Sequence, residues 1–119
     1  MIFGIGTDLI EVARVGKACE KENFLHRIFT QAEQELISGN TQRAAGNFAV
    51  KEAVVKAFGT GFGAIAPIDI EVLREASGKP YVVLYGAAKE FQVEQQITQI
   101  HVSISNTKEY ATAYVVVEK

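Results

Sequence analysis

Residues 47–61 join a long run of helix-forming residues to a glycine-rich stop and read NFAVKEAVVKAFGTG. Such a run predicts a helix, which we expect to begin near Thr41 and to end at Gly59. Glu52 follows Phe48 by four residues, so the two side chains share a face that should otherwise pack inward. Glu52 also precedes Lys56 by four residues, and a solvated Glu–Lys pair is the simplest interpretation of a lone carboxylate.

The composition describes an ordinary globular chain. A length of 119 residues favours one compact domain over residues 1–119. A net charge of −2 gives no sign of a nucleic-acid surface. No apolar run approaches the roughly 18 residues of a membrane helix, and no basic segment of a signal peptide precedes the first apolar residues. We therefore expect a cytoplasmic protein without a membrane or nucleic-acid partner.

Cysteine and histidine offer little chemistry. The single cysteine, Cys19, cannot form an internal disulfide. Its neighbour Glu20 would not lower the pKa of the thiol, so Cys19 is a poor nucleophile. His26 and His101 lie too far apart in sequence for a metal-binding motif.

The first residues, IFGIGTD at 2–8, predict a short strand. Gly4 and Gly6 weaken a strand and often mark the close approach of another backbone or of a ligand. Asp8 ends this strand and precedes a predicted helix over 9–21. Because aspartate is a preferred N-cap, a purely structural role for Asp8 remains open at this point.

The remaining elements alternate between helical and extended patterns. Thr30 and Glu33 form a capping box. In order, the expected elements are a helical turn over 24–29, a helix over 31–37, a hairpin over 68–84, a helix over 86–96, and strands over 98–106 and 110–118. This order favours an α+β fold with a mainly antiparallel sheet packed against the long central helix. The run YVVVE at 114–118 is unusually apolar for an edge strand, which suggests a face covered by oligomerisation.

Asp8 and Glu52 are the two carboxylates that could together hold a hard divalent cation. Magnesium takes one or two protein carboxylates, keeps several waters and binds substrate phosphates. Lys51, Lys56 and the loop over 59–63 could supply phosphate contacts. That loop lacks the spacing of a Walker motif, and a plain helix C-cap explains it better than a phosphate-binding loop when it is taken alone.

Four segments of the chain match one family pattern: GIGTDLIEVARV at 4–15, NFAVKEAVVKAFGTGFG at 47–63, GKPYV at 78–82 and HVSISNTKEYATAYVVV at 101–117. With these motifs the chain resembles the holo-acyl-carrier-protein synthases, the small bacterial phosphopantetheinyl transferases. The resemblance implies transfer of 4′-phosphopantetheine from coenzyme A to a serine of acyl carrier protein, in support of fatty acid biosynthesis. It also implies adenosine 3′,5′-bisphosphate as by-product, and a homotrimer with active sites between neighbouring subunits.

The resemblance also assigns roles to individual residues. Asp8 and Glu52 fall on the family's magnesium ligands, and Lys56 falls on a lysine near the substrate phosphates; these three are the candidate catalytic residues. The serine proton could pass to Glu52 or to a water on the metal. Arg14 falls on the helix that faces the carrier protein. The loop at the coenzyme site is matched by Gly59, Gly61 and Gly63.

Two positions depart from the family pattern. Asn47 stands where arginine is usual and Asn106 where histidine is usual, both expected near coenzyme A. Losing a charged donor predicts a deficit of about 1–2 kcal/mol per site in coenzyme binding. Restoring the family residues at both positions should then lower the KM for coenzyme A. The departures also keep two other hypotheses open: a non-catalytic coenzyme A- or carrier-binding homologue, and a structural trimer in which Asp8 is only a cap.

Overall fold

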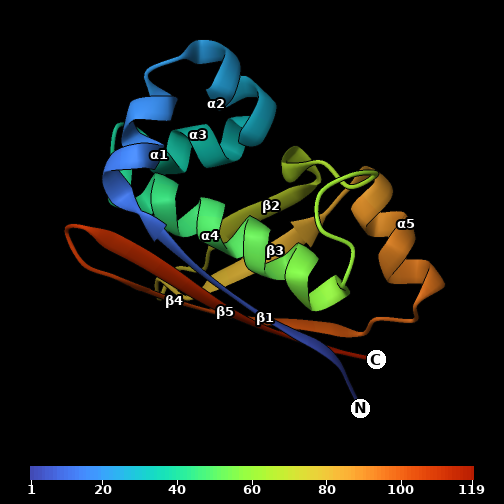
Figure 1. Cartoon of the computed structure of the whole chain (residues 1–119). Helices are drawn as coiled ribbons and strands as arrows, with labels where there is room; N and C mark the ends of the chain where they lie inside the picture. Colours follow the sequence, from blue (N-terminus) through green and yellow to red (C-terminus); the bar gives the residue numbers. More distant parts are fainter.

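The computed structural model describes residues 1–119, whose elements are shown in Figure 1. In chain order these are β1 (Ile2–Glu11), α1 (Val12–Cys19), α2 (Glu22–Ile28), α3 (Gln31–Ile37), α4 (Thr41–Phe58), the 3₁₀ turn η1 (Pro67–Asp69), β2 (Ile70–Arg74), β3 (Pro80–Leu84), α5 (Gly86–Glu94), β4 (Gln99–Asn106) and β5 (Tyr110–Glu118). The α+β prediction is confirmed, and every strand pair is antiparallel. None of the helices combines the length and hydrophobicity needed to cross a bilayer.

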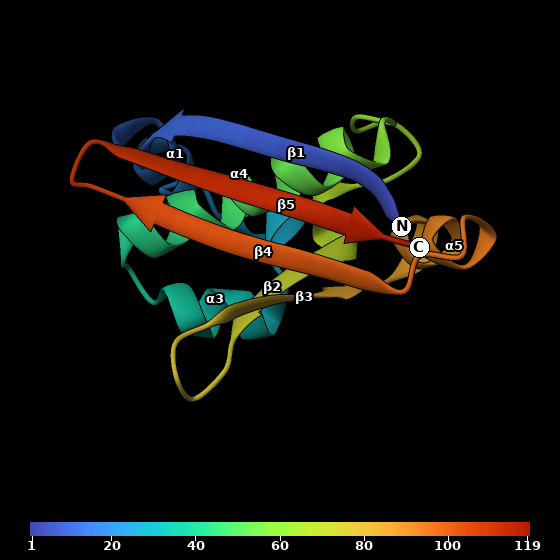
Figure 2. The ribbon, with the colours of Figure 1, turned by 90° about the horizontal axis from the view of Figure 1, so that it is seen from below.

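The larger sheet has the strand order β1–β5–β4, so the apolar last strand is central (Figure 2). The expectation that residues 114–118 form an edge is therefore wrong. Ala113, Val115 and Val117 alternate on the buried face of β5. A strand paired on both sides and buried on one face needs this hydrophobicity for its own packing.

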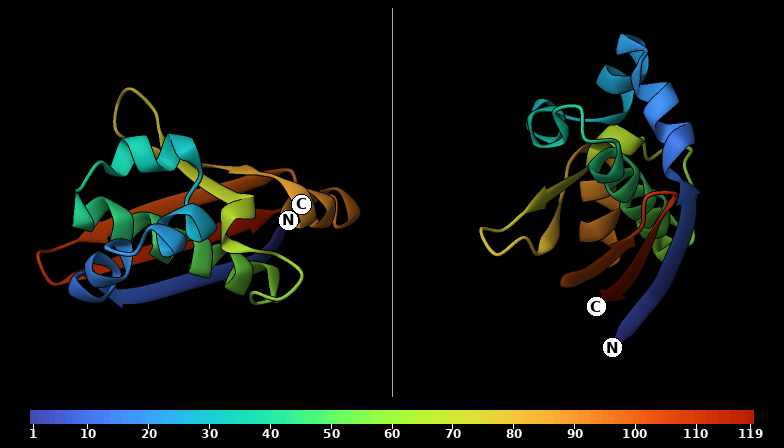
Figure 3. Two further views of the ribbon diagram at one scale, coloured as in Figure 1. Left: turned by 90° about the horizontal axis from the view of Figure 1, so that it is seen from above. Right: turned by 90° about the vertical axis from the view of Figure 1, so that its left-hand side faces the viewer.

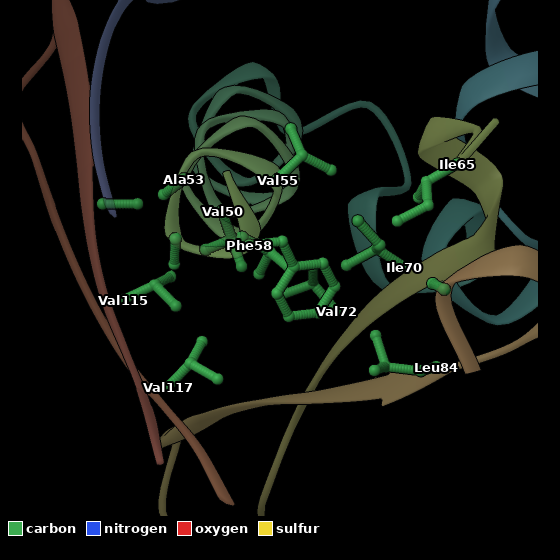
Figure 4. Packing of buried hydrophobic residues seen from close by; sticks show 14 of the residues in the cluster. Val50, Ala53, Val55, Phe58, Ile65, Ile70, Val72, Leu84, Val115 and Val117 are labelled. Atoms are coloured by element: carbon green, nitrogen blue, oxygen red, sulfur yellow. The ribbon is translucent and has the colours of Figure 1, made fainter. Parts of the chain in front are cut away.

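Helix α4 lies between this sheet and the β2–β3 hairpin. Figure 4 shows Val115 and Val117 of β5 facing α4 from one side, with Ile70 and Val72 of β2 on another. Because α4 is covered on several sides, its residues are apolar around most of its circumference. Helices α1–α3 pack near the first half of α4 (Figure 3).

Two glycines let β1 lie directly on α4. A Cβ atom at Gly4 would overlap the carbonyl oxygen of Ala57, and one at Gly6 would overlap the carbonyl oxygen of Ala53. The prediction that these glycines mark a close approach of another backbone is confirmed. This contact sets β1 at the distance from α4 that the candidate site requires.

Strand β1 is longer than its sequence predicts. It continues to Glu11, and α1 begins only at Val12, so the expected helix start after residue 8 is wrong. Pairing with β5 causes the difference, because it runs without a break from Asp8, opposite Ala113, to Glu11, opposite Tyr110. Asp8 therefore lies within a strand, and its interpretation as a helix N-cap is wrong.

One face of the larger sheet is left uncovered, as Figure 2 shows. Its side chains alternate with the buried ones, and three large residues on it are mostly exposed: Ile5 at 71%, Leu9 at 68% and Tyr114 at 64%. We call this surface, defined by Ile5, Leu9, Tyr110, Tyr114 and Val116, the outer face. Monomeric proteins rarely leave such a contiguous apolar patch in water.

Candidate active site

A pocket of about 370 Å³ opens between β1, α1, α2 and α4. It is lined by Asp8, Leu9, Ile10, Arg14, Val15, Ala18, Phe24, Phe48 and Glu52. The structure thus brings together three residues that the sequence singled out on separate elements: Asp8, Arg14 and Glu52. Phe24, which is far from all three in sequence, joins them through the packing of α2.

The fold places the two carboxylates side by side. Asp8 is the partner of Ala113, whose side chain is buried, so Asp8 faces α4 rather than the solvent. Glu52 reaches the same pocket from α4. Partial burial raises the pKa of Glu52, and the negative charge of Asp8 raises it further, while Lys56 opposes both effects. Burial and the neighbouring carboxylate therefore both disfavour the ionised form of Glu52.

Lys56 is tied to β1. Its Nζ atom donates to the carbonyl oxygen of Thr7 at 3.0 Å and to Oδ1 of Asp8 at 3.2 Å. The expected helical ion pair between Lys56 and Glu52 is therefore wrong, since the carboxylate partner of Lys56 is Asp8. The side chain of Lys56 remains 53% exposed, so it can leave Asp8 for an incoming anion at little cost.

The donor set suits magnesium. No group of three or more histidine, cysteine, aspartate or glutamate side chains could hold a metal ion. Two carboxylates beside an open pocket are nevertheless what magnesium uses when waters and substrate phosphates complete its shell. A bound dication would favour the ionised form of Glu52, which burial and the charge of Asp8 disfavour.

Asn47 and Lys51 do not reach this pocket. Asn47 is completely buried, and its Nδ2 donates to Oε2 of Glu33 at 3.1 Å and to the carbonyl oxygen of Val72 at 3.0 Å. Lys51 is equally buried and donates to Oε1 of Glu33 at 2.8 Å. Both side chains face the interior network around Glu33. The assignment of Asn47 to coenzyme A stays a prediction.

The glycine loop has the geometry of a helix stop. Gly59 caps α4 with φ of 78°, and its N–H points back to the carbonyls of Val55 and Lys56. Gly61 lines a separate pocket of about 340 Å³ beside α5. None of the glycines at 59, 61 and 63 lines the carboxylate pocket. Their assignment to the coenzyme stays a prediction, as does that of Asn106, which is exposed at the end of β4.

Sequence reasoning missed the apolar wall of the pocket. The rings of Phe24 and Phe48 lie 6.2 Å apart between centroids, and Val15 and Ala18 of α1 continue the wall. The sequence could have placed Phe48 in the wall, because it precedes Glu52 by one helical turn. No local pattern could have placed Phe24 there, because its position depends on how α2 folds back on α4.

Known proteins resemble the chain along nearly its whole length. A family model for the 4′-phosphopantetheinyl transferase superfamily matches residues 4–115. The holo-[acyl-carrier-protein] synthase of Lachnoclostridium phytofermentans is 61% identical, with 99% of this chain and 97% of that protein covered. The enzyme of the same name from Clostridium kluyveri is 45% identical, with 99% and 91% covered.

Solved structures agree with the sequence comparison. The crystal structure of the Neisseria meningitidis holo-[acyl-carrier-protein] synthase superposes with a TM-score of 0.90 at 34% identity, covering 100% of both chains. That of the Helicobacter pylori enzyme, solved in complex with coenzyme A, gives 0.86 at 33% identity, covering 96% of this chain and 99% of the other.

Proposed function

The chain belongs to the 4′-phosphopantetheinyl transferase superfamily, and from that premise we propose that it is a holo-acyl-carrier-protein synthase. It transfers 4′-phosphopantetheine from coenzyme A to a serine of apo-acyl carrier protein and releases adenosine 3′,5′-bisphosphate. The observation that carries the proposal is the meeting of Asp8 and Glu52 in one pocket, with Lys56 held on Asp8. Residues 1–119 then form one transferase domain.

The reaction exchanges one P–O bond for another. The serine oxygen forms a bond to the phosphorus that carries pantetheine, the bond to the bridging oxygen breaks, and the electron pair leaves with the bisphosphate. Asp8 and Glu52 would hold magnesium, which when bound supplies the positive charge that phosphoryl transfer requires. Lys56 would donate to the phosphate oxygens once released from Thr7 and Asp8.

The serine hydroxyl must give up its proton as the new bond forms. Glu52 or a water on the metal would accept this proton, and Glu52 can do so only through a carboxylate oxygen that does not hold the metal. Phe24 and Phe48 make that side of the pocket apolar, and with substrate bound they would help to keep water away, which would favour attack by the serine over hydrolysis.

The carrier protein would approach over α1. Arg14 is exposed at the rim of the pocket, where a guanidinium can pair with carboxylates of an acidic partner. Such a pair would steer the carrier serine toward Asp8 and Glu52. This activity supplies fatty acid biosynthesis, and we place the enzyme in the cytoplasm.

We also propose a homotrimer. The outer face exposes Ile5, Leu9 and Tyr114 on strands that are otherwise well packed, and copies of the chain around a three-fold axis would cover it. Active sites between neighbouring subunits would follow, since the carboxylate pocket opens beside β1, an edge strand of the sheet.

Mass spectrometry of the carrier tests the function. The protein is incubated with coenzyme A, magnesium and a bacterial apo-acyl carrier protein, and we expect the carrier to gain one phosphopantetheine. Chelation should stop the gain, and Asp8→Asn or Glu52→Gln should slow it by about 10²-fold or more, as for other lost groups that stabilise transition-state charge. Glu35→Gln on α3 removes an exposed carboxylate that does not line the pocket and serves as control.

A second candidate is a non-catalytic homologue that binds coenzyme A. The interior position of Asn47 favours it, because no cation at this position meets the coenzyme. The same assay decides between the two. An unmodified carrier together with retained coenzyme A binding would refute the transferase and support the binding protein.

A further inference from the structure

A buried ion pair close to the carboxylate pocket takes no part in the proposed reaction. Nζ of Lys51 and Oε1 of Glu33 lie 2.8 Å apart, and both side chains are completely buried. The same ammonium group donates to the carbonyl oxygens of Pro67 and Ile70. Neither Lys51 nor Glu33 lines the pocket. The pair therefore holds α3, η1 and β2 on α4 without touching the site.

Stability is a weak reason for such a pair to exist. Removing two charges from water offsets much of their attraction, and apolar side chains of similar volume often serve a protein interior as well or better. A hydrogen-bonded pair differs from apolar packing in its fixed geometry, because each bond has a preferred distance and direction. The role of this pair is therefore expected in the groups that it holds in place.

One of these groups is the ring of Phe29, directly after α2. The ring is completely buried, and Nζ of Lys51 lies over it at 5.4 Å from the centroid. Oε1 of Glu33 also accepts from the N–H of Thr30, the next residue along the chain, at 3.2 Å. The ion pair thus holds Phe29 in two ways, through the face of its ring and through the backbone that follows it.

Phe29 in turn supports the apolar wall of the pocket. Its ring meets the ring of Phe24 edge-on, with 6.3 Å between centroids, and the ring of Phe24 lies 6.2 Å from that of Phe48. Phe24 and Phe48 line the pocket, and both pack against the smaller core cluster, to which Phe29 belongs. Because an edge-on contact has a preferred geometry, a displaced Phe29 would take Phe24 with it.

We propose that Lys51 and Glu33 are positioning residues for the pocket, acting through Phe29 on the wall that Phe24 and Phe48 form. The contacts are continuous from the ammonium group to each ring in turn. The carboxylates do not depend on this wall, because β1 packs directly on α4. A displaced wall should therefore disturb a carrier that approaches over α1 and leave the binding of coenzyme A unchanged, a consequence that rests on the proposed function.

Nuclear magnetic resonance of the full chain tests the positioning itself. The double variant Glu33→Gln with Lys51→Met removes both charges together, so no unpaired charge is left in the interior. Neither substitution removes a ring, so the Overhauser contact between the rings of Phe24 and Phe48 reports their separation directly. We expect this contact to weaken in the double variant and in Phe29→Leu, and the second variant decides if the first does not fold. An unchanged contact in the folded variants overturns the proposal.

Steady-state kinetics test the consequence for the site. Phe29→Leu keeps the ion pair and removes the ring that links it to the wall. We expect the KM for the carrier to rise about fivefold, the equivalent of one aromatic contact, while kcat and the KM for coenzyme A stay as in the wild type. Leu84→Ala removes buried packing from the larger core cluster and is the matched control, which should change neither KM nor the ring contact. Circular dichroism verifies folding.

The two measurements separate this proposal from the proposed function. If the wild type modifies the carrier while Phe29→Leu and Leu84→Ala have the same KM for it, the positioning role is wrong and the transferase stands. If the wild type leaves the carrier unmodified while the ring contact still depends on the ion pair, only the transferase is refuted. A rise of both KM values to the same extent in Phe29→Leu and in the control would show a general loss of stability and would also overturn the positioning role.

Discussion

At the scale of single residues, the pocket has two carboxylates, of which only one is paired with an ammonium group. Lys56 is paired with Asp8, which leaves Glu52 without a direct cationic partner. Burial and the charge of Asp8 both disfavour ionised Glu52 and raise its pKa. Because the folded-state pKa is raised, ionisation of Glu52 opposes folding as the pH rises from the ordinary pKa of a glutamate through the raised folded-state pKa. A bound cation would reverse this effect.

Thermal unfolding at neutral pH tests that balance. Glu52→Gln should unfold at the same or a higher temperature than the wild type without metal, since it removes the repelled charge. Magnesium should raise the Tm of the wild type, by an amount equivalent to about 2.7 kcal/mol at a hundredfold excess over its Kd, but not that of Glu52→Gln. Calcium-free buffer with chelator provides the baseline. A metal-induced rise of equal size in both proteins would show that Glu52 is not a ligand.

The side chain of Asn47 is buried and donates hydrogen bonds to two interior acceptors, so its loss should affect stability. Asn47→Ala leaves Oε2 of Glu33 and the carbonyl oxygen of Val72 without their donor. We expect the free energy of unfolding to fall by about 1–3 kcal/mol, the cost of unpaired buried acceptors, while the KM for coenzyme A stays as in the wild type. Denaturant titration and steady-state kinetics measure the two quantities. A raised KM with unchanged stability would place the side chain at the coenzyme instead.

At the scale of elements, local signals in the sequence predicted the helices well. Oγ1 of Thr30 accepts from the N–H of Glu33, and the Glu33 side chain accepts from the N–H of Thr30, as the capping box predicted. Gly59 ends α4 in the left-handed conformation that favours glycine. These features depend on a few neighbouring residues, so the sequence contains them directly.

The parts that were not predicted depend on contacts between distant segments. Leu9 to Glu11 look helical by pattern, but β5 pairs with them and keeps them extended. The hydroxyl of Thr112 donates to the carbonyl oxygen of Asp8 at 2.8 Å across the same pair. Likewise, no local pattern shows that Asn47 meets Glu33. Pairing and burial override local preference wherever the partner lies far away in the chain.

The contact between β1 and α4 is the element-scale feature that most directly controls the site. Gly6→Ala would place a methyl group on the carbonyl oxygen of Ala53, so β1 must move away from α4. We expect a loss of about 1–3 kcal/mol in stability, typical of overpacking, and a larger loss of carrier modification because Asp8 moves with β1. Gly63→Ala, where nothing lies within 4 Å of the added atom, is the control for stability. Full activity in Gly6→Ala would contradict the proposed link between this contact and the carboxylates.

At the scale of the whole molecule, one face of the larger sheet is covered by other elements and the opposite face is exposed. Both sheets and α5 pack toward α4, whereas the outer face has no covering element (Figure 2). The face lies on the strand that carries Asp8 and on its neighbours, so whatever covers it also approaches the pocket. Assembly and catalysis are therefore expected to depend on the same surface.

A charge placed on the outer face separates these two effects from folding. Tyr114 lies on the central strand with its side chain pointing away from the core, so Tyr114→Glu should preserve the circular dichroism spectrum. In the assembly the same carboxylate would be buried without a partner, which costs several kcal/mol. Light scattering should show a change from three times the 13.0 kDa chain mass to a single chain, together with loss of carrier modification. Val93→Glu introduces the same charge at an exposed valine of α5 and should leave both unchanged. A wild type that is monomeric and active would refute the trimer, and an active monomeric variant would show that each site is complete within one subunit.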